Sequence, residues 1–407
     1  MSCSATPLRL YAGRLATGSS AYASSWCTCS AHKSFDKTVG RAMSTTAAGA
    51  RVMQAAVPTT ENGSAGSDAP VLRLQRVPVP ELKGPNQVLL KVLGTAVNRA
   101  DLLQKRGRYP PPPGASEILG LEAFGKVEAS NVDSFRPGDE VIALLQGGGY
   151  ASYAVTDSAT LIKLDPYPEY YLSFDASLGK FERRGPDRVA ACAGIAEAFL
   201  TAYQLLKFDP SLGNASPGET VLIHAGASGV GLAAIQTARE LGLKVLVTAG
   251  SQAKVQACMQ LGASRGWVYR TQPVEMLVDF CGGPESVDIV LDCVGSSYVE
   301  IHPQVLRRHG RWVLFGTLGG TRGNLDLSQI LRKNIRLVGT TLRARPLAYR
   351  EALVREWSTF ASPRFASGVL LPVVDANGIF PLSESEAAHT YVEKSSNIGK
   401  VILRVDV

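Results

Sequence analysis

Two kinds of hydrophobic pattern divide the chain. Between residues 70 and 160, short apolar runs are broken by Pro and Gly, a pattern typical of a small β-rich barrel. The strands expected there are 71–74, 87–92, 124–128, 140–145 and 150–155. Between residues 220 and 342, β-branched apolar runs alternate with segments of helical spacing, which predicts a parallel sheet covered by helices on both faces. A helix at 349–360, another near 383–393 and a final strand at 400–405 are expected to return the chain to the first domain.

The most informative segment reads strand, glycine turn, helix. An apolar run at 220–223 is followed by Gly226, Gly229 and Gly231, after which helical spacing begins. This order is typical of a dinucleotide pyrophosphate site, in which Gly226 permits the turn, Gly229 lets the backbone approach the phosphates and Gly231 lets the helix pack on the strand. A glycine turn that serves packing alone is the alternative. The residues expected to contact the cofactor here are Gly226, Ser228, Gly229, Val230 and Gly231, with Ser228 in the place of the motif's middle glycine.

The residues after the next strand favour NADP(H) over NAD(H). An acidic residue at this place would hold the ribose of NAD, but the segment after the strand at 244–248 contains Ser251 and Lys254 and no acid. A carboxylate would repel a 2′-phosphate, whereas a hydroxyl and an ammonium group bind it. Tyr269, at the end of an expected third strand, is placed on the adenosine side. The alternatives are a solvated lysine at 254 and an edge-packed ring at 269.

Composition describes a globular chain long enough for two domains. It has 407 residues, 45% of them hydrophobic, and no apolar run approaches the length of a membrane span. The seven cysteines lack C-x-x-C spacing, which fits reduced thiols. The formal net charge is +7, but most of it lies in the first 60 residues, where six Lys and Arg accompany the single acid Asp36. The rest of the chain is nearly neutral, which argues against nucleic acid as a partner.

The leader, residues 1–52, differs in character from the rest. It is rich in Ser, Ala and basic residues and poor in acids, so it resembles an organelle transit peptide. We therefore expect a mitochondrial or plastid location, between which composition does not choose. If the leader is instead a disordered tail, or precedes an internal start such as Met43 or Met53, the expected location is cytoplasmic.

Several motifs in order resemble one family over about residues 52–407. They are Val97–Gln104, Arg106–Gly114, Ile118–Glu122, the glycine turn, Val247–Gln252, Gly310–Gly316 and Asn397–Lys400. They resemble the zinc-free quinone oxidoreductases of the medium-chain dehydrogenase/reductase superfamily, most closely the p53-inducible branch. The resemblance implies a GroES-like β-barrel catalytic domain at 53–186 and 343–407 and a Rossmann coenzyme domain with a doubly wound parallel sheet at 187–342. It also implies NADPH in the cleft and a homodimer built largely through the Rossmann sheets.

The same resemblance places further residues in the cleft. Asn98 and Tyr109 are implied near the substrate and the nicotinamide, as the candidate catalytic pair. The implied contacts of the cofactor are Thr201 near the nicotinamide amide and Phe315, Gly316, Leu342 and Arg343 along its other side. The alternatives are a turn-capping amide at Asn98 and a packed aromatic ring at Tyr109.

No metal is expected. Zinc-dependent relatives carry a ligand cysteine near 97–99 and a ligand histidine between Gly120 and Glu122, where this chain has no cysteine and has Leu121. A catalytic zinc needs three protein ligands, and the five histidines lack metal-ligand spacing. Asp101 and Glu122 are expected to serve as hydrogen-bonding, structural residues.

Without a metal or an evident nucleophile, the chemistry that fits is direct hydride transfer from NADPH to a quinone. An enone or enoyl reductase is the alternative enzyme, and a non-catalytic NADPH-binding protein, crystallin-like or RNA-binding, is the alternative class. Residues 166–186 form a tyrosine-rich insertion relative to the family. It is interpreted either as a surface excursion without function or as a segment that shapes substrate access or a partner surface.

Overall fold

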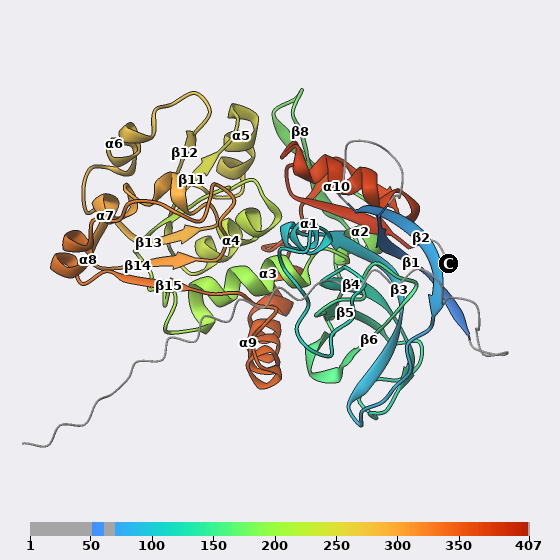
Figure 1. The fold of residues 1–407 in the computed structure, drawn as a ribbon. Coiled ribbons are helices and arrows are strands. Elements are labelled where there is room, and N and C mark those ends of the chain that lie inside the picture. The colour runs from blue at the N-terminus through green and yellow to red at the C-terminus, as the bar shows by residue number, and fades with distance from the viewer. Residues whose placement is uncertain (1–50, 61–69, 406–407) are drawn as a thin grey trace, which may run out of the picture. The chain divides into compact units, whose positions relative to one another are not determined.

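The computed structural model describes residues 51–60 and 70–405, and residues 50–407 group into one compact unit (Figure 1). Apart from Arg51 and Val52, the expected transit peptide lies outside the described residues. Val52 is already the first residue of a strand, β1 (Val52–Thr59), which pairs antiparallel with β2 (Val71–Pro78).

The residues expected to form a barrel fold largely into a seven-stranded sheet. Its hydrogen-bonded order is β16-β17-β3-β4-β5-β7, and β6 also pairs with β3. The strands are β3 (Gln87–Val97), β4 (Glu122–Ser130), β5 (Glu140–Leu144), β6 (Tyr153–Asp157), β7 (Leu161–Ile162), β16 (Val374–Pro381) and β17 (Lys400–Arg404). All five strands predicted between residues 70 and 160 are confirmed. Strand β16 was missed because Asp375, Asn377 and Gly378 interrupt its apolar run with residues that favour turns.

Residues 220–342 contain the predicted parallel sheet. Its six strands run in the order β12-β11-β10-β13-β14-β15, which is the doubly wound order 3-2-1-4-5-6. They are β10 (Thr220–Ile223), β11 (Lys244–Ala249), β12 (Arg265–Val268), β13 (Val287–Asp292), β14 (Leu306–Leu314) and β15 (Arg336–Gly339). Every neighbouring pair is parallel. The expected Rossmann architecture is confirmed.

Alternate residues of the central strands pack into two different cores. Val221 and Ile223 of β10 join the core that contains α4 (Gly229–Glu240) and α3 (Ala196–Tyr203). Leu222, between them, joins the core that contains α6 (Leu277–Cys281) and α7 (His302–Val305). Because successive side chains of a strand point to opposite faces, both faces of the sheet are covered. Its ligand-binding edge is therefore at the strand ends.

A nearly continuous helical stretch, Arg188–Phe208, lies between the two sheets in the sequence. It comprises α2 (Arg188–Cys192), α3 and a π-helical turn at Gln204–Phe208. Among the described residues it alone has the length and hydropathy of a membrane span, but its most apolar window is 89% buried inside the protein. It is a core helix, since Phe199 packs edge-on against Phe365 and lies beside the buried Trp357.

The C-terminal segment returns to the first sheet, as predicted. Strand β17 pairs antiparallel with β3, and α9 (Leu347–Ala366) and α10 (Ser385–Glu393) match the two expected helices. The remaining helices are α1 (Arg99–Lys105), α5 (Gln252–Gln260) and α8 (Leu327–Lys333). The proposed domain boundaries at 186/187 and 342/343 stay predictions.

The insertion at 166–186 forms a hairpin of β8 (Tyr171–Asp175) and β9 (Lys180–Arg184). On one side the Leu172 amide donates to the Pro372 carbonyl, at 2.8 Å. On the other, Gln260 of α5 donates to the Gly179 carbonyl at 2.6 Å and accepts from the Phe181 amide at 3.2 Å. The hairpin therefore links the segment before β16 to a helix of the parallel sheet, a role that neither interpretation of the sequence anticipated.

Candidate functional site

The turn between β10 and α4 is built as a helix N-terminus with a polar cap. Ser228 is the N-cap, and its hydroxyl accepts from the Gly231 amide at 3.0 Å. A Cβ at Gly231 would lie 2.5 Å from the carbonyl oxygens of Ala225 and Gly226. Gly231 therefore allows the helix to pack closely on the turn, as expected from the sequence.

The role expected for Gly226 needs a correction. The left-handed residue of the turn is Ala225, with φ 52°, so Gly226 does not supply the positive dihedral angle. A Cβ at Gly226 would instead lie 2.9 Å from Cβ of Val247 and 3.1 Å from the sulfur of Cys258. Gly226 is required because β11 and α5 leave no room for a side chain.

Backbone N–H groups at the start of α4 point out of the helix end and can bind an anion. The first amides of a helix have no acceptor within it, and apart from an isolated parallel bridge between Ser228 and Gly399 no partner is found for those of Gly229 and Val230 in the described part of the chain. Together with the positive end of the helix dipole, they form a site suited to phosphate. These are two of the residues that the sequence assigns to the pyrophosphate.

Lys400 reaches this turn from β17. A Cβ at Gly229 would clash with Cδ of Lys400, and a Cβ at Gly194 would lie 3.0 Å from its Cγ. The ammonium group donates to Oε1 of Glu122 and to Oδ1 of Asn98, both at 2.7 Å. Both charged side chains are buried. Sequence reasoning included Lys400 in a family motif but assigned it no role in the site.

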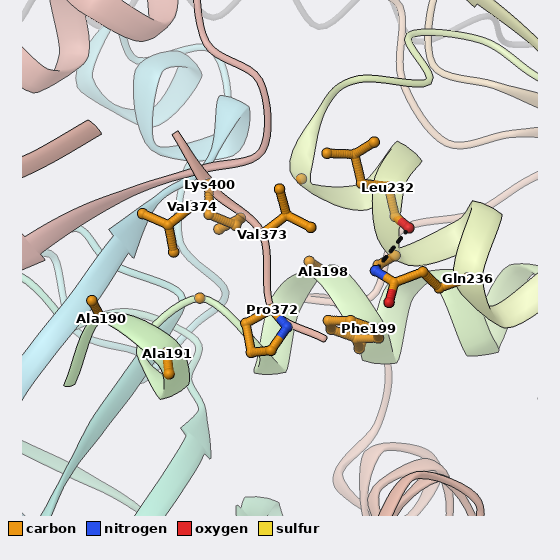
Figure 2. A pocket seen from close by; sticks show the side chains of 13 residues that line it. Ala190, Ala191, Ala198, Phe199, Leu232, Gln236, Pro372, Val373, Val374 and Lys400 are labelled. Carbon is orange, nitrogen blue, oxygen red and sulfur yellow. Dashed lines mark hydrogen bonds between the residues drawn. The ribbon is translucent and has the colours of Figure 1, made fainter. Parts of the chain in front are cut away.

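Small residues allow this close approach. Figure 2 shows the pocket beside the turn, with Lys400 next to Val373 and Val374 on one side and Leu232 and Gln236 of α4 on the other. Alanine and glycine positions of α2, α3 and α4 line it, together with Phe199 and Leu232. Gln236 closes it by donating to the Leu371 carbonyl at 3.1 Å and accepting from the Leu371 amide at 2.9 Å. Of the residues predicted to bind cofactor, Gly229 alone lines this pocket.

Asn98 is held in a network of buried charges. It is the N-cap of α1, its side-chain amide donates to Glu122 at 2.9 Å, and its own backbone amide donates to Asp101 at 2.8 Å. Asp101 also accepts from the Gly120 amide at 3.0 Å. Burial raises the pKa of Asp101 to about 6. Asp101 and Glu122 are thus engaged in hydrogen bonds, as expected, and Asn98 joins them at the site.

Tyr109 and Arg343, from distant parts of the sequence, lie together. The Arg343 guanidinium group is 5.4 Å from the centre of the Tyr109 ring and donates twice to the Gln146 carbonyl, at 2.8 and 2.6 Å. Gln146 in turn donates to the Arg343 carbonyl at 2.8 Å. Burial raises the pKa of Tyr109. Leu342, the neighbour of Arg343, is also buried.

One residue of this region was missed by sequence reasoning. Glu197 lies in the first turn of α3, about one helical turn before Thr201, and its backbone amide donates to Glu122 at 3.0 Å. Burial, reinforced by the negative charge of Glu122, raises the pKa of Glu197 to about 8. Its i, i+4 spacing from Thr201 was a readable signal, because such residues share a face of a helix.

Phe315 and Gly316 follow β14 at the carboxyl edge of the parallel sheet. The Phe315 amide donates to the Asp292 carbonyl at 2.8 Å. A Cβ at Gly316 would lie 3.0 Å from the Cys293 carbonyl oxygen. The structure thus places both residues at the ends of the two neighbouring strands β13 and β14, where ligands bind in doubly wound folds.

The residues proposed for the 2′-phosphate lie at the start of α5. Ser251 is its N-cap and accepts from the Lys254 amide at 3.4 Å. The Lys254 ammonium group donates to the Ser395 carbonyl at 2.5 Å, so it is not a freely solvated lysine. Tyr269 is 43% exposed, and its hydroxyl would lie 2.9 Å from a Cβ at Gly250.

Two further cationic side chains, those of Arg270 and Arg99, lie near Lys254. Arg270 was missed, although it directly follows Tyr269, and its Nε would lie 3.5 Å from a Cβ at Gly250. Arg99 donates to the Ser395 hydroxyl at 2.6 Å. Burial lowers the pKa of Lys254, and the positive charges of Arg270 and Arg99 lower it further. The positive charges of these side chains repel one another, and a bound anion would reduce that repulsion.

The described part of the chain holds no group of three or more His, Cys, Asp or Glu residues that could bind a metal ion. Asn98, within the segment 97–99, and Leu121 lie where the sequence resemblance places the zinc ligands of zinc-dependent relatives. The first bonds to Glu122 and Lys400, and the second is buried. Neither side chain is a usual ligand of zinc.

Comparisons with known proteins agree with this geometry. Residues 84–166 match the family model for the alcohol dehydrogenase GroES-like domain, and residues 229–358 match the model for zinc-binding dehydrogenases. Quinone oxidoreductase 1 of Escherichia coli is 30% identical over 328 residues, which cover 78% of this chain and 91% of that protein. Quinone oxidoreductase of Lama guanicoe is 29% identical over 343 residues, which cover 82% and 93%.

A solved structure extends the likeness to three dimensions. The quinone oxidoreductase of Thermus thermophilus, determined alone and in complex with NADPH, superposes with a TM-score of 0.66 and 30% sequence identity. The match covers 86% of this chain and 100% of that protein. The chain is therefore an oxidoreductase that belongs to the quinone oxidoreductase family of medium-chain dehydrogenases/reductases.

Proposed function

We propose that this chain is an NADPH-dependent quinone reductase that transfers hydride directly, without a metal. The observation that carries the proposal is the pairing of two anion sites along the parallel sheet. One is the N-terminus of α4, and the other is the cation cluster at the start of α5. A dinucleotide with an extra 2′-phosphate has anionic groups for both sites.

The residues present fit that cofactor. The amides of Gly229 and Val230 would hold the pyrophosphate, and Ser251, Lys254 and Arg270 would hold the 2′-phosphate. Thr201, Phe315 and Gly316 would line the nicotinamide end. When bound, NADPH supplies a hydride, which is a proton together with two electrons.

The proposed acceptor site comprises Asn98 and the adjacent pair Tyr109 and Arg343. Asn98 and Tyr109 are both half-buried, so they combine restricted access to water with partial exposure. The Tyr109 ring offers a flat surface on which a quinone ring stacks, and loss of that positioning would cost roughly a hundred-fold in rate. A quinone is favoured as the acceptor because its conjugated carbonyl accepts hydride without activation by a metal.

Steady-state oxidation of NADPH with a panel of quinones and open-chain enones tests the proposal. We expect turnover with quinones and a clear preference for NADPH over NADH. Turnover confined to the enones would show an enone reductase instead. Tight NADPH binding without turnover of either class would contradict the proposal and identify a non-catalytic NADPH-binding protein.

We also propose a homodimer formed through the edge of the parallel sheet. Strand β15 is the last strand of the sheet, and Leu337 on it is exposed. Leu327 and Leu331 of α8 are 70% and 77% exposed. An edge strand with neighbouring exposed leucines is suited to pairing with a second copy of itself.

The leader supports a proposed organellar location through its composition alone. Expression of the full chain with a C-terminal fluorescent protein tests this proposal. Organellar fluorescence and a shortened mature chain are expected, whereas cytoplasmic fluorescence with residue Met1 retained would contradict it.

A further inference from the structure

Two buried histidines, His224 and His302, face each other beside the nucleotide-binding turn. Their Nε2 atoms lie 2.8 Å apart, and both side chains are shielded from solvent. His224 directly follows β10 and precedes Ala225, the left-handed residue of the turn, whereas His302 begins α7. Neither ring is among the pocket residues or the cofactor contacts described above, so the proposed function gives this pair no role.

The pair connects the ends of three neighbouring strands of the parallel sheet, β11, β10 and β13. Nδ1 of His224 is 2.9 Å from the hydroxyl of Thr248 in β11. Nδ1 of His302 is 3.6 Å from Oδ2 of Asp292, the last residue of β13. That separation is too long for a hydrogen bond, and in the described part of the chain this nitrogen has no other partner. A buried polar atom without a partner calls for an explanation.

Asp292 holds a negative charge next to that nitrogen. Its Oδ2 accepts from the Trp312 indole at 2.9 Å, and its Oδ1 accepts from the amides of Val294 and Gly295 at 2.7 and 2.9 Å. Burial raises the pKa of Asp292, but these three donors favour the ionised form. An ionised carboxylate only accepts, so it favours a proton at Nδ1 of His302.

The charge of Asp292 decides where the protons of the two rings lie. Burial lowers the pKa of His224 to about 3 and that of His302 well below its usual range, so both rings are neutral and each carries one N–H group. With its proton at Nδ1, His302 has an acceptor at Nε2, and His224 donates to it from its own Nε2. Nδ1 of His224 then accepts from the Thr248 hydroxyl. The opposite arrangement would leave a lone pair of His302 facing the carboxylate.

The His224 ring supports the turn at which NADPH is proposed to bind. Thr248 bonds to the ring through its hydroxyl, and its carbonyl accepts from the Gly226 amide of the turn at 2.9 Å. The Tyr298 ring stacks on the His224 ring, with centres 4.2 Å apart. Tyr298 ends a short helix, Ser296–Tyr298, that follows the amides bound to Asp292. A fixed His224 ring therefore supports both the turn after β10 and the loop after β13.

We propose that His302 is a positioning residue for the coenzyme, which accepts the N–H of His224 and so holds that ring and the turn after it in one hydrogen-bonded arrangement. The inference rests on the proposed binding of NADPH at this turn and adds a determinant of affinity that does not touch the ligand. Asp292 and Thr248 complete the arrangement, because each faces the outer nitrogen of one ring. Packing alone does not require this order of donors and acceptors, so the two explanations make different predictions.

Nitrogen NMR of the cofactor-free protein, labelled at the histidine nitrogens, tests the proton positions without turnover. We expect one fixed neutral tautomer for each ring, with the proton on Nε2 of His224 and on Nδ1 of His302, unchanged between about pH 5 and pH 8. The exposed His309 is the reference, because a solvated ring exchanges between its tautomers. Averaged tautomers in either buried ring, or a proton on Nε2 of His302, would overturn the proposal.

Replacement of His302 tests the effect on coenzyme binding. In His302→Gln the side-chain carbonyl can replace Nε2 as the acceptor, whereas His302→Leu fills the space and leaves the His224 N–H unsatisfied. An unsatisfied buried donor disfavours its arrangement by a factor of roughly 5–150, so His302→Leu should weaken NADPH binding at least about fivefold. His302→Gln should bind NADPH more tightly than His302→Leu and should keep the Nε2 proton of His224. His309→Asn, at an exposed left-handed position, is the control that should change neither property.

The outcomes separate the two proposals. An NADPH affinity of His302→Leu equal to that of the wild type, or equal losses in both variants, would overturn the role of His302 alone. If His302→Leu does not fold, the tautomer in His302→Gln decides, because loss of the Nε2 proton of His224 there would overturn the proposal. Absence of NADPH binding by the wild-type protein would overturn the proposed function, and the positioning role with it.

Discussion

Lys400 shows how one residue joins the first sheet to the nucleotide-binding turn. Its stem fills the space beside Gly194 and Gly229, and its ammonium group neutralises the fully buried Glu122. A buried ion pair contributes little over an apolar pair of the same shape, but removal of one partner leaves a charge without compensation.

We therefore predict that Lys400→Met destabilises the protein by about 3–5 kcal/mol, the cost of breaking a buried pair. Urea unfolding followed by circular dichroism measures this change. The exposed Lys394→Met is the matched control and should stay within about 0.5 kcal/mol of wild type. Adding Glu122→Gln to Lys400→Met should recover part of the loss, and an additive double mutant would contradict the pairing.

A second prediction for a single residue concerns Glu197 and how the stability of the protein depends on pH. Its folded pKa, about 8, lies above the ordinary 4.5, so the folded state binds the proton more tightly between these values. Its contribution to stability is fully present below pH 4.5 and is lost as the pH rises through about 8. The free energy of unfolding of wild type relative to Glu197→Gln should fall from about pH 5 to about pH 9, as the linkage relation requires. A constant difference would contradict the raised pKa.

Substitution of Lys254 tests whether this residue makes the protein prefer NADPH over NADH. Loss of a hydrogen bond to a charged group costs about 1.5–3 kcal/mol, so Lys254→Ala should weaken NADPH binding roughly ten- to hundred-fold. NADH binding should hardly change, because it lacks the 2′-phosphate. Titration by nucleotide fluorescence measures both affinities, and equal losses for the two cofactors would contradict the assignment.

At the scale of elements, the glycine turn shows what a sequence pattern can and cannot predict. The strand, turn and helix followed from hydrophobic spacing and from glycines in a local segment. The reason for Gly226 did not, because Val247 and Cys258, which exclude a side chain there, belong to elements further along the chain. The sequence pattern identified Gly226, but the packing of Val247 and Cys258 around it explains why a glycine is required there.

Gly231 supplies a prediction for this element. A Cβ there would lie 2.5 Å from two carbonyl oxygens, so Gly231→Ala must push α4 away from the turn. Overpacking of this kind costs about 1–3 kcal/mol, and it would also move the amides proposed to bind pyrophosphate. We expect a lower thermal midpoint and weaker NADPH binding. Gly84→Ala, where the nearest atom is 3.5 Å from the added Cβ, is the control that should change neither.

The hairpin β8–β9 and the buried ion pair of Lys400 with Glu122 were not predicted from the sequence. Both depend on contacts between segments far apart in the chain, such as Gln260 with Phe181 and Lys400 with Glu122. Local spacing carries no information on such pairs. Of the residues taken from the family motifs, Tyr109 and Arg343 lie together, whereas Glu197 and Arg270 were found only from the fold.

At the scale of the whole molecule, the proposed dimer gives a further prediction. Leu331→Glu places a charge on the most exposed leucine beside the edge strand β15. Burial of an unpaired charge in an interface is costly, so the variant should elute as a monomer in size-exclusion chromatography with light scattering, where the wild type elutes as a dimer. Leu178→Glu on the hairpin loop, also exposed, is the control. A monomeric wild-type protein would contradict the dimer.

The central claim concerns the two parts of the molecule acting together, with the parallel sheet holding NADPH and the first sheet holding the acceptor. Single-turnover oxidation of NADPH carrying deuterium at the transferred position, by chelator-treated enzyme mixed with a quinone, tests it most directly. Direct hydride transfer without a metal predicts slower oxidation of the deuterated cofactor, hydroquinone formed at the same rate as NADPH is consumed, and full activity after chelation. Loss of activity on chelation, or a semiquinone that accumulates without an isotope effect, would contradict the account.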